Sequence, residues 1–400
     1  MIIREEYLNR IRPFYNSEMI KVITGMRRSG KSVFLKQIIN ELEQNNIPKE
    51  NIIYINLEDF ENRCLYKDEQ LFKYIKTRLV NNKKYYIFID EIQNVIGFER
   101  VINSFRSTHD CSIFITGSNS SLLSSEIATL LSGRTISIHM LPFKFSEFVE
   151  FNKTNNKDLD TLLFEYLKWG GIPLVIKQDE ETKSVVLENI YDSIVQRDII
   201  TREKRIDNKG LTRIIDYLVG TSSKTISGRN ISNILKENGF KISVPTVYNY
   251  IDSIVKACII DKIKRYDING KKILAFEEKM YTKDIGFFNL RKTKLSEENG
   301  AIIETVIYNE LISRGYKVYI GKTKNSEIDF IAEKHGRKCY IQACYLLTDG
   351  KTAEREFSAY DSVLDNYPKY VISLDKITNN RNGIIHLNLI DFLLNPNLID

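Results

Sequence analysis

The sequence has few cysteines, and their spacing suits neither a disulfide framework nor a zinc site. Five cysteines are scattered along 400 residues, an odd number without a Cys-x-x-Cys pair. The histidine spacing that would complete a zinc site is also missing. A structural zinc site of the usual kind is therefore excluded, and we expect a reduced, cytoplasmic setting.

Long hydrophobic runs are missing as well. The first twenty residues, MIIREEYLNRIRPFYNSEMI, interrupt every apolar run with charge, so they lack the core of a signal peptide. No stretch of 18 apolar residues occurs in the sequence. We therefore expect neither export nor a membrane span, and no membrane partner. Internal repeats and low-complexity linkers are also missing.

What the sequence does contain is typical of a large globular protein. Hydrophobic residues make up 42% and charged residues 28%, enough apolar content to bury sizeable cores. A length of 400 residues suggests roughly two to four domains. The 58 basic and 52 acidic residues give a net charge of +6, which permits a polyanionic partner without requiring one.

The first third alternates short β-branched runs with helical segments, which indicates an α/β fold with a parallel sheet. The helical segments begin at Lys31, near residues 70–79 and near 98–106, and a further strand is expected at 136–140. The strand-like runs are continuously apolar, so both faces of the sheet should be covered by helices. These runs are KVIT, NIIYIN, YYIFID and CSIFIT.

The rest of the chain changes pattern twice, which predicts four regions in all. We assign residues 1–140 to the core built on this parallel sheet and 141–204 to a helical lid on that core. Residues 205–280 show three helices and two strand-like runs, the order of a winged helix-turn-helix, with a type I′ hairpin signal at Asn269-Gly270. Residues 281–400 are expected to form a further α/β domain.

A phosphate-binding loop follows the first strand-like run and opens a predicted helix. Its glycines allow backbone N–H groups to surround a β-phosphate, Lys31 neutralises β/γ oxygens, and the Ser32 hydroxyl completes a Mg²⁺ shell. A Gly-rich turn without a ligand is the alternative. The predicted ATP-binding residues are Gly25, Met26, Arg27, Arg28, Ser29, Gly30, Lys31 and Ser32.

Two carboxylates end the apolar run at residues 86–89. This is the Walker B pattern, and we expect its strand to neighbour the strand that precedes the loop. Asp90 would bind Mg²⁺ through water, and Glu91 would act as general base toward the attacking water. Taken alone, an Asp-Glu pair is more typical of a helix N-terminal turn. The phosphate loop about 60 residues upstream favours the catalytic interpretation.

Two further residues are candidates for catalysis. Asn119 follows the strand-like run at 113–116, where a short polar side chain can orient water or touch a γ-phosphate; a Ser/Asn-capped loop is the alternative. Arg134 follows a predicted helix and is a candidate arginine finger toward a neighbouring subunit, with a solvated arginine as the alternative. An oligomer is compatible with these features.

An ordered set of motifs along nearly the whole chain resembles the AAA-type P-loop ATPases of bacteria and archaea that carry a C-terminal restriction-endonuclease-like domain of unknown function. The resemblance implies ATP and Mg²⁺ as cofactors, and ATPase chemistry more firmly than any pathway. The motifs are GMRRSGKS, YIFIDEIQNV, ITGSNS, LLSGR, LPFKFSEF, YLKWGGIP, QRDI, EIDF and YIQACY.

Residues 221–275 are basic, with ten Lys or Arg against four Asp or Glu, a local charge of +6. If they form a winged helix, Ser243 caps a recognition helix starting near Pro245. Thr246, Tyr248 and Asn249 would then face the major groove of DNA. A winged helix that contacts protein, with its charge solvated, is the alternative.

The C-terminal region has the layout of a restriction-endonuclease-like core without its full set of ligands. Glu304 lies on a predicted helix, and Asp329 lies at the start of a strand. Active members carry an acid and a lysine two positions later, but here these are Gln342 and Cys344. We expect a degenerate site that does not cut DNA. If it does cut, Lys338 or Lys351 are candidates for the missing cation.

The sequence therefore supports an ATPase that drives a conformational change passed to DNA or to a protein partner. One alternative is a nucleotide-dependent binding module that does not hydrolyse ATP. Another is an active Mg²⁺-dependent nuclease. The Asp90-Glu91 pair favours hydrolysis, because a protein that only binds ATP does not need Glu91.

Overall fold

The structure is a computed structural model that describes residues 2–80, 83–118, 133–201, 208–292, 299–323, 326–347 and 350–399, with the backbone alone at 275–277. The chain divides into two compact units. The first contains Met1–Met140 with Lys256–Cys258, and the second contains Leu141–Val255 with Ile259–Asp400.

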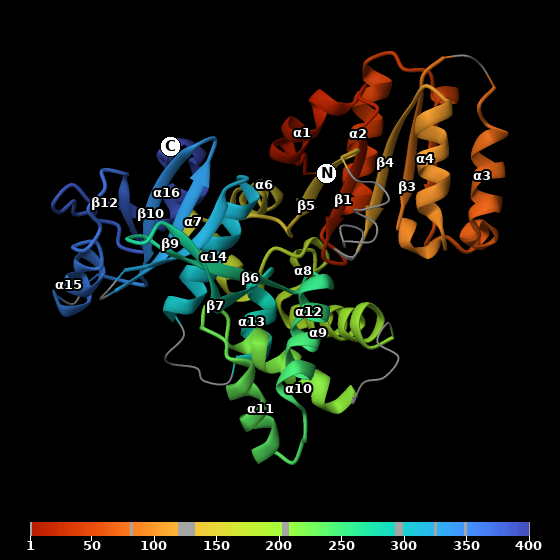
Figure 1. The fold of residues 1–400 in the computed structure, drawn as a ribbon. Helices are drawn as coiled ribbons and strands as arrows, with labels where there is room; N and C mark the ends of the chain where they lie inside the picture. Colours follow the sequence, from red (N-terminus) through yellow and green to blue (C-terminus); the bar gives the residue numbers. More distant parts are fainter. Residues whose placement is uncertain are drawn as a thin grey trace. The chain divides into compact units, whose positions relative to one another are not determined.

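The first unit is built on a parallel five-stranded sheet with strand order β2-β3-β4-β1-β5 (Figure 1). The predicted parallel α/β fold is therefore confirmed. Its strands are β1 (Ile20–Gly25), β2 (Ile52–Asn56), β3 (Tyr85–Asp90), β4 (Cys111–Gly117) and β5 (Thr135–Met140). Its described α-helices are α1 (Glu5–Ile11), α2 (Lys31–Gln44), α3 (Asp68–Lys76) and α4 (Phe98–Thr108).

Both faces of this sheet are covered, which explains the continuously apolar strands. In β3, Ile87 and Ile89 join the core formed with α3 and α4, whereas Tyr86 and Phe88 join the core formed with α1 and α2. Successive side chains of a strand point to opposite faces, so a strand between two helical layers needs an apolar residue at every position.

The strand order differs from the expectation in one respect. β4 pairs with β1 on one side and with β3 on the other, so the strand ending in Asp90 does not neighbour the strand that precedes the phosphate loop. The sequence gives the strands but not their lateral order, which depends on crossover connections. Polar residues at the end of β4 therefore lie between the loop and the two carboxylates.

The second unit is helical in its first half and contains one large sheet. Its helices are α6 (Phe145–Phe151), α7 (Leu159–Trp169), α8 (Pro173–Ile176), α9 (Glu180–Ile194), α10 (Asn208–Gly220), α11 (Gly228–Glu237), α12 (Val244–Lys256), α13 (Ile285–Arg291), α14 (Asn299–Ser313), α15 (Gly350–Ser358) and α16 (Leu389–Leu394). Its strands are β6 (Ile260–Asp267), β7 (Lys272–Thr282), β8 (Lys317–Lys322), β9 (Glu327–Lys334), β10 (Arg337–Ala343), β11 (Lys369–Ser373) and β12 (Ile385–Asn388).

The seven strands have the order β12-β11-β10-β9-β8-β6-β7, so the β6-β7 hairpin continues the sheet of the C-terminal region. The boundary expected at residue 280 falls inside β7. The hairpin loop also differs from the type I′ expectation. Asp267 pairs with Lys272, which leaves four residues in the loop, and it is Lys271 rather than Gly270 that has a positive φ, of 49°. Two-residue type I′ turns require positive φ at both central positions.

Residues 141–204, expected to form a lid on the P-loop core, instead belong to the second unit. Their apolar side chains pack on α13: the Tyr191 and Phe287 rings meet edge to face, with centroids 5.3 Å apart. The Gly170-Gly171 break is held by the buried Asp284 carboxylate, which accepts hydrogen bonds from Gly171 N and Gly286 N. Helical periodicity predicts these helices but not the surface on which they pack.

Two further sequence expectations concern membranes and thiols. Within the described residues, no helix combines the length and apolar character that a bilayer span requires. All five cysteines are free thiols, and only Cys64 is exposed.

Candidate functional site

The phosphate loop lies where β1 ends and α2 begins, and its backbone is held closely on both sides. Gly25 has a φ of 151°, and a Cβ there would lie 2.2 Å from the Met140 carbonyl oxygen of β5. No other residue fits this position without moving the strand. From the N-terminal segment, Arg4 Nη1 donates to the Ser29 carbonyl oxygen at 3.3 Å. The loop therefore has a defined conformation.

The Lys31 ammonium group lies over the loop and connects it to the acidic pair. Its Nζ donates to the carbonyl oxygens of Gly25 at 3.1 Å and Met26 at 3.2 Å. The same atom lies 3.7 Å from Glu91 Oε1, and the Lys31 side chain is 4% exposed. The structure therefore brings together the lysine of the loop and the carboxylate expected to act as base.

The Asp90 carboxylate is held by hydroxyl groups from the strands on either side of β3. Thr116 Oγ1 on β4 donates to Asp90 Oδ1. Tyr54 on β2 donates its hydroxyl to Asp90 Oδ2 at 3.2 Å. Burial, and then the nearby Asp90 carboxylate, raise the pKa of Tyr54, so its hydroxyl stays protonated and continues to donate.

Glu91 combines an unusual backbone with a well-held side chain. Its φ of 56° is left-handed, which is uncommon outside glycine and costs free energy. Glu91 N donates to Thr116 Oγ1 at 3.0 Å, and Gln93 Nε2 donates to Glu91 Oε2. Burial alone would raise the pKa of Glu91. The Lys31 charge, the Gln93 hydrogen bond and smaller contributions outweigh burial, so the pKa is lowered and the carboxylate is ionised at neutral pH.

The residues present fit a nucleotide and Mg²⁺. Ser29 Oγ is buried in the loop and makes no hydrogen bond within the described part of the chain, so an acceptor such as a phosphate oxygen would satisfy it. Ser32 is exposed in the first turn of α2, where helix N-terminal N–H groups favour anions. Ser32 and Asp90 supply the oxygen ligands that Mg²⁺ prefers.

The two other catalytic candidates have different outcomes. Asn119 lies outside the described residues. Arg134 is exposed just before β5, and its carbonyl oxygen accepts from Ile20 N at the start of β1. The loop begins five residues farther along β1, roughly 17 Å away at the usual rise of a strand. Arg134 therefore lies at the opposite edge of the sheet from its own phosphate loop.

Sequence reasoning missed three residues of this site. Thr116 lies near the end of an apolar strand, so the rule that polar residues at strand ends form sites could have identified it as well as Asn119. Tyr54 lies in an apolar run and looks like an ordinary core residue. Arg4 carries no local signal, because its partner lies 25 residues away in the loop.

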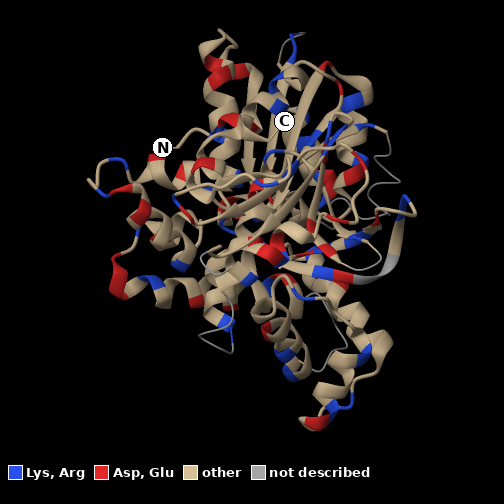
Figure 2. Cartoon of the chain, turned by 90° about the vertical axis from the view of Figure 1, so that its left-hand side faces the viewer, with Lys and Arg blue, Asp and Glu red and all other residues tan. Residues whose placement is uncertain are grey.

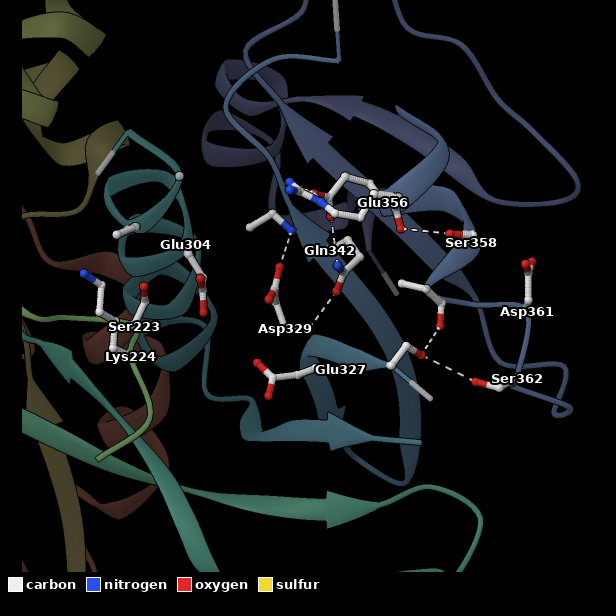
Figure 3. A pocket seen from close by; sticks show the side chains of 16 residues that line it. Ser223, Lys224, Glu304, Glu327, Asp329, Gln342, Glu356, Ser358, Asp361 and Ser362 are labelled. Atoms are coloured by element: carbon white, nitrogen blue, oxygen red, sulfur yellow. Dashed lines mark hydrogen bonds and ion pairs between the residues drawn. The ribbon is translucent and has the colours of Figure 1, made fainter. Parts of the chain in front are cut away.

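A second candidate site lies in the second unit, where Glu304, Asp329 and Gln342 line one cavity of about 860 Å³. Figure 3 shows Glu304 projecting from α14 toward Asp329, Gln342 and Glu356 on the elements opposite. Gln342 Oε1 accepts from Asp329 N at 2.7 Å, and Gln342 Nε2 donates to Glu356 Oε2 at 2.9 Å. The structure therefore brings the three predicted residues together, with Glu356 as a fourth that the sequence did not indicate.

Lys279 from β7, a residue that the sequence did not suggest, supplies a cation to this cluster, and Arg355 on α15 pairs with Glu356 at 2.6 Å. Lys279 Nζ lies 3.0 Å from Glu304 Oε1 and 3.8 Å from Asp329 Oδ1. Lys338 lies elsewhere, 3.6 Å from Asp365, and Lys351 is exposed on α15. At the usual lysine position, burial raises the pKa of Cys344 to about 11. Within the described part of the chain, no group of three His, Cys, Asp or Glu residues could hold a metal ion.

The expected DNA-reading face of α12 is only partly available. The Tyr248 ring packs on Gly228 of α11, where a Cβ would lie 2.7 Å from it, and the Tyr248 hydroxyl accepts from Gly228 N. Thr246 shares a 2.8 Å hydrogen bond with the capping Ser243. Asn249 is exposed. Tyr248 and Thr246 therefore have local packing roles that periodicity alone did not indicate.

The basic charge of residues 221–275 is also partly used within the fold. Arg265 is 6% exposed and pairs with Glu327, while Lys262 lies 3.5 Å from both Asp252 and Glu278. In the view of Figure 2, basic and acidic residues are interspersed. The net charge of the segment therefore overstates the positive surface that it presents.

Comparisons with known proteins agree with the geometry of the first unit. The AAA domain family matches residues 17–149, and a domain of unknown function, DUF8612, matches residues 160–298. A solved structure, the Walker-type ATPase PABY2304 of Pyrococcus abyssi, shares the fold with a TM-score of 0.52 and 15% identity. That likeness covers 72% of this chain and 95% of the archaeal chain.

Two relatives are similar over almost their whole length. An uncharacterized protein of Haemophilus influenzae is 37% identical over 377 residues, 93% of each chain. The uncharacterized protein MJ1544 of Methanocaldococcus jannaschii is 34% identical over 380 residues, 91% of this chain and 83% of the relative. With the AAA domain match and the phosphate loop described above, these similarities show that the chain belongs to a family of AAA-type P-loop ATPases shared by bacteria and archaea.

Proposed function

We propose that this protein hydrolyses ATP at the carboxyl edge of the five-stranded sheet and passes the resulting conformational change to DNA or to a protein partner. The observation that carries the proposal is the convergence of three separate segments. Lys31 lies 3.7 Å from Glu91, and Thr116 binds both Glu91 and Asp90. A site that only bound nucleotide would not need a buried, ionised Glu91 beside its lysine.

The residues divide the work of hydrolysis among them. Lys31 would bind the β/γ oxygens of ATP, and Ser32 and Asp90 would hold Mg²⁺, which neutralises charge on the phosphate oxygens when bound. Glu91 would take a proton from the attacking water as the water oxygen bonds to the γ-phosphorus. The bond from that phosphorus to the β,γ-bridging oxygen breaks, which leaves ADP and phosphate.

Phosphate release and ATP titration test this proposal. Lys31→Ala should weaken ATP binding by at least ~1.5 kcal/mol, because a charged hydrogen-bond donor to the phosphates is lost. Glu91→Gln should keep ATP affinity while slowing single-turnover hydrolysis ~10²–10⁴-fold. Unchanged hydrolysis by Glu91→Gln would place the base elsewhere. Tight binding of ATP by the wild type without turnover would favour the module that does not hydrolyse ATP.

The nature of the partner is addressed by repeating phosphate release with and without duplex DNA. Stimulation by DNA would support a DNA partner, contacted through residues 221–275. Three helices followed by the β6-β7 hairpin support a winged-helix arrangement there. If hydrolysis does not respond and duplex does not bind, a protein partner is favoured.

We also propose that the C-terminal cavity belongs to a nuclease-like domain that does not cut DNA. Gln342 offers a neutral amide and Cys344 a neutral thiol where active enzymes use an acid and a lysine. Plasmid and single-stranded DNA should stay intact with protein, ATP and Mg²⁺ or Mn²⁺. Cutting by the wild type that vanishes in Asp329→Ala would overturn this proposal and favour the nuclease alternative.

A further inference from the structure

Lys279 and three carboxylates form a cluster at the edge of the C-terminal cavity, and Glu327 is its most exposed member, at 34%. Its Nζ lies 2.7 Å from Glu327 Oε1, 3.0 Å from Glu304 Oε1 and 3.8 Å from Asp329 Oδ1. The Lys279 side chain is 8% exposed. The carboxylates come from α14 and β9, whereas the lysine comes from β7, the second strand of the hairpin. One ammonium group thus contacts carboxylates from two other elements.

The charges of this cluster are nearly balanced without any added ion. Glu304, Glu327 and Asp329 supply up to three negative charges, against Lys279 and Arg265, which also pairs with Glu327. Two of these three charges are therefore offset by cations that belong to the chain itself. Most of the negative charge of the cluster is thus balanced without a divalent ion.

The protonation of Lys279 is also secured by its neighbours. Burial alone would lower the pKa of this lysine. The carboxylates of Glu304, Asp329 and Glu327 raise the pKa by more than burial lowers it, so the net shift is upward. The hydroxyl of Tyr281, two residues along β7, donates to Glu304 Oε1 at 2.7 Å. The Glu304 carboxylate thus has an ammonium group and a hydroxyl group as partners. A carboxylate at a metal site would have the metal ion and a metal-bound water in these two roles.

A divalent ion would have to displace this ammonium group. Mg²⁺ contacts its oxygen ligands at about 2.0–2.1 Å, closer than the Lys279 nitrogen lies to any of these carboxylates. An ion at the centre of the cluster would also be repelled by the charge on Lys279. These facts agree with the lack of a metal-binding group of three side chains within the described residues.

We propose that the Lys279 ammonium occupies the position of a divalent cation, so that this carboxylate site is neutralised from within the chain and does not depend on metal. The inference rests on the proposal that the domain does not cut DNA, and it names the residue responsible. Removing the Lys279 charge while keeping its apolar stem should leave a site for a divalent or trivalent cation at Glu304 and Asp329.

The test is terbium binding to the full chain without nucleotide, followed by luminescence sensitised by tyrosine. Tyr281 contacts Glu304 and is well placed to sensitise an ion bound there. Lys279→Met should bind Tb³⁺ at least about tenfold more tightly than the wild type, because the competing charge is gone. The matched control Lys279→Arg keeps the charge and should resemble the wild type. Adding Asp329→Asn to Lys279→Met should abolish the gain in Tb³⁺ affinity. The Tb³⁺ binding that remains in this double variant comes from other acidic positions and is subtracted.

Two outcomes would overturn the inference. Wild-type protein that binds Tb³⁺ or Mn²⁺ through Asp329 as tightly as Lys279→Met would show that the lysine does not replace a cation. Folded Lys279→Met that gains no Asp329-dependent binding would show that the carboxylates do not form a cation site. Neither outcome depends on cleavage, so failure of this inference can be distinguished from failure of the proposal about nuclease activity.

Folding of Lys279→Met is followed by circular dichroism and thermal unfolding. Unpaired buried carboxylates should lower its Tm, and Mn²⁺ should raise the Tm of this variant more than that of the wild type. If the variant does not fold even with Mn²⁺, the wild type is compared instead with a double variant, Lys279→Gln with Glu304→Gln. This double variant lacks one positive and one negative charge. Charge neutralisation by Lys279 predicts that this double variant folds, and failure to fold would contradict it.

Discussion

The Thr116 hydroxyl donates a hydrogen bond to the Asp90 carboxylate and accepts another from the backbone N–H of Glu91 at 3.0 Å. One hydroxyl on the central strand β4 thus fixes both members of the acidic pair at the end of β3. The bond to Glu91 N also stabilises the left-handed backbone of Glu91, whose φ is 56°. Thr116 is therefore a positioning residue for the proposed hydrolysis.

Replacement of this hydroxyl should slow hydrolysis more than it weakens ATP binding. Thr116→Val keeps the shape but leaves Glu91 N without its acceptor, at a cost of about 1–3 kcal/mol. We expect kcat to fall about tenfold or more, since 1.4 kcal/mol corresponds to a factor of ten. Thr116→Ser keeps the hydroxyl and should retain most of the activity. Equal kcat in Val and Ser variants would exclude this positioning role.

The pH dependence of hydrolysis should reflect the lowered pKa of Glu91. Its carboxylate must be ionised to act as base, so activity should persist below the usual titration range of a glutamate and fall only at more acidic pH. Gln93→Leu removes a hydrogen bond that lowers this pKa in the free enzyme, so the acidic limb of the kcat/KM profile should move to higher pH. A limb that does not move in this variant would argue that another group titrates there.

Gly170 should tolerate substitution far less well than another glycine with a positive φ. A Cβ on Gly170 would lie 1.9 Å from Asp284 Oδ1, whereas one on Gly239 would meet no atom within 4 Å. Gly239→Ala should cost about 1–2 kcal/mol for its backbone conformation. Gly170→Ala should cost at least ~1–3 kcal/mol more, because the clash displaces a buried acceptor. Urea unfolding of the two variants measures the difference.

Asp284 should make the stability of the second unit depend on pH. Burial raises the pKa of Asp284 to about 7, although Gly171 N and Gly286 N lower it in part. The folded state therefore binds this proton more tightly than the unfolded state. The resulting contribution is fully present below about pH 4 and is lost as the pH rises to about 7. The measurement compares the free energy of unfolding at pH 4.5 with that at pH 7.5. The wild type should gain this contribution at the lower pH, and Asp284→Ala should not.

DNA binding through residues 221–275 should be steeply dependent on salt. Lys271 and Lys272 are exposed at the β6-β7 hairpin, so replacing both with Ala should lower the slope of log affinity against log salt by about 2. Lys49 and Lys73 are exposed in the first unit, and their double Ala variant is the control. Fluorescence anisotropy without duplex binding at low ionic strength would instead assign this region to protein contacts.

Much of the first unit could be predicted because its signals are local. Continuous apolar runs predicted strands covered on both faces, and the cores on either side of β3 explain why. The phosphate loop is readable because four fixed positions within eight consecutive residues each have a separate chemical requirement. Asp90 and Glu91 are readable because the end of a buried parallel strand is where polar side chains gather. The residue types and their short spacing are sufficient for all of these predictions.

Only the tertiary structure decided which distant segments meet. The insertion of β4 between β1 and β3 made Thr116 a partner of Asp90, although 26 residues separate them. The joining of β6 and β7 to β8 placed Lys279 among Glu304, Glu327 and Asp329, up to 50 residues away. Strand pairing depends on the packing of whole elements, and the periodicity of a single element does not encode its neighbour. The sequence by itself therefore determined which chemical groups are present, whereas the fold determined which of them neutralise one another.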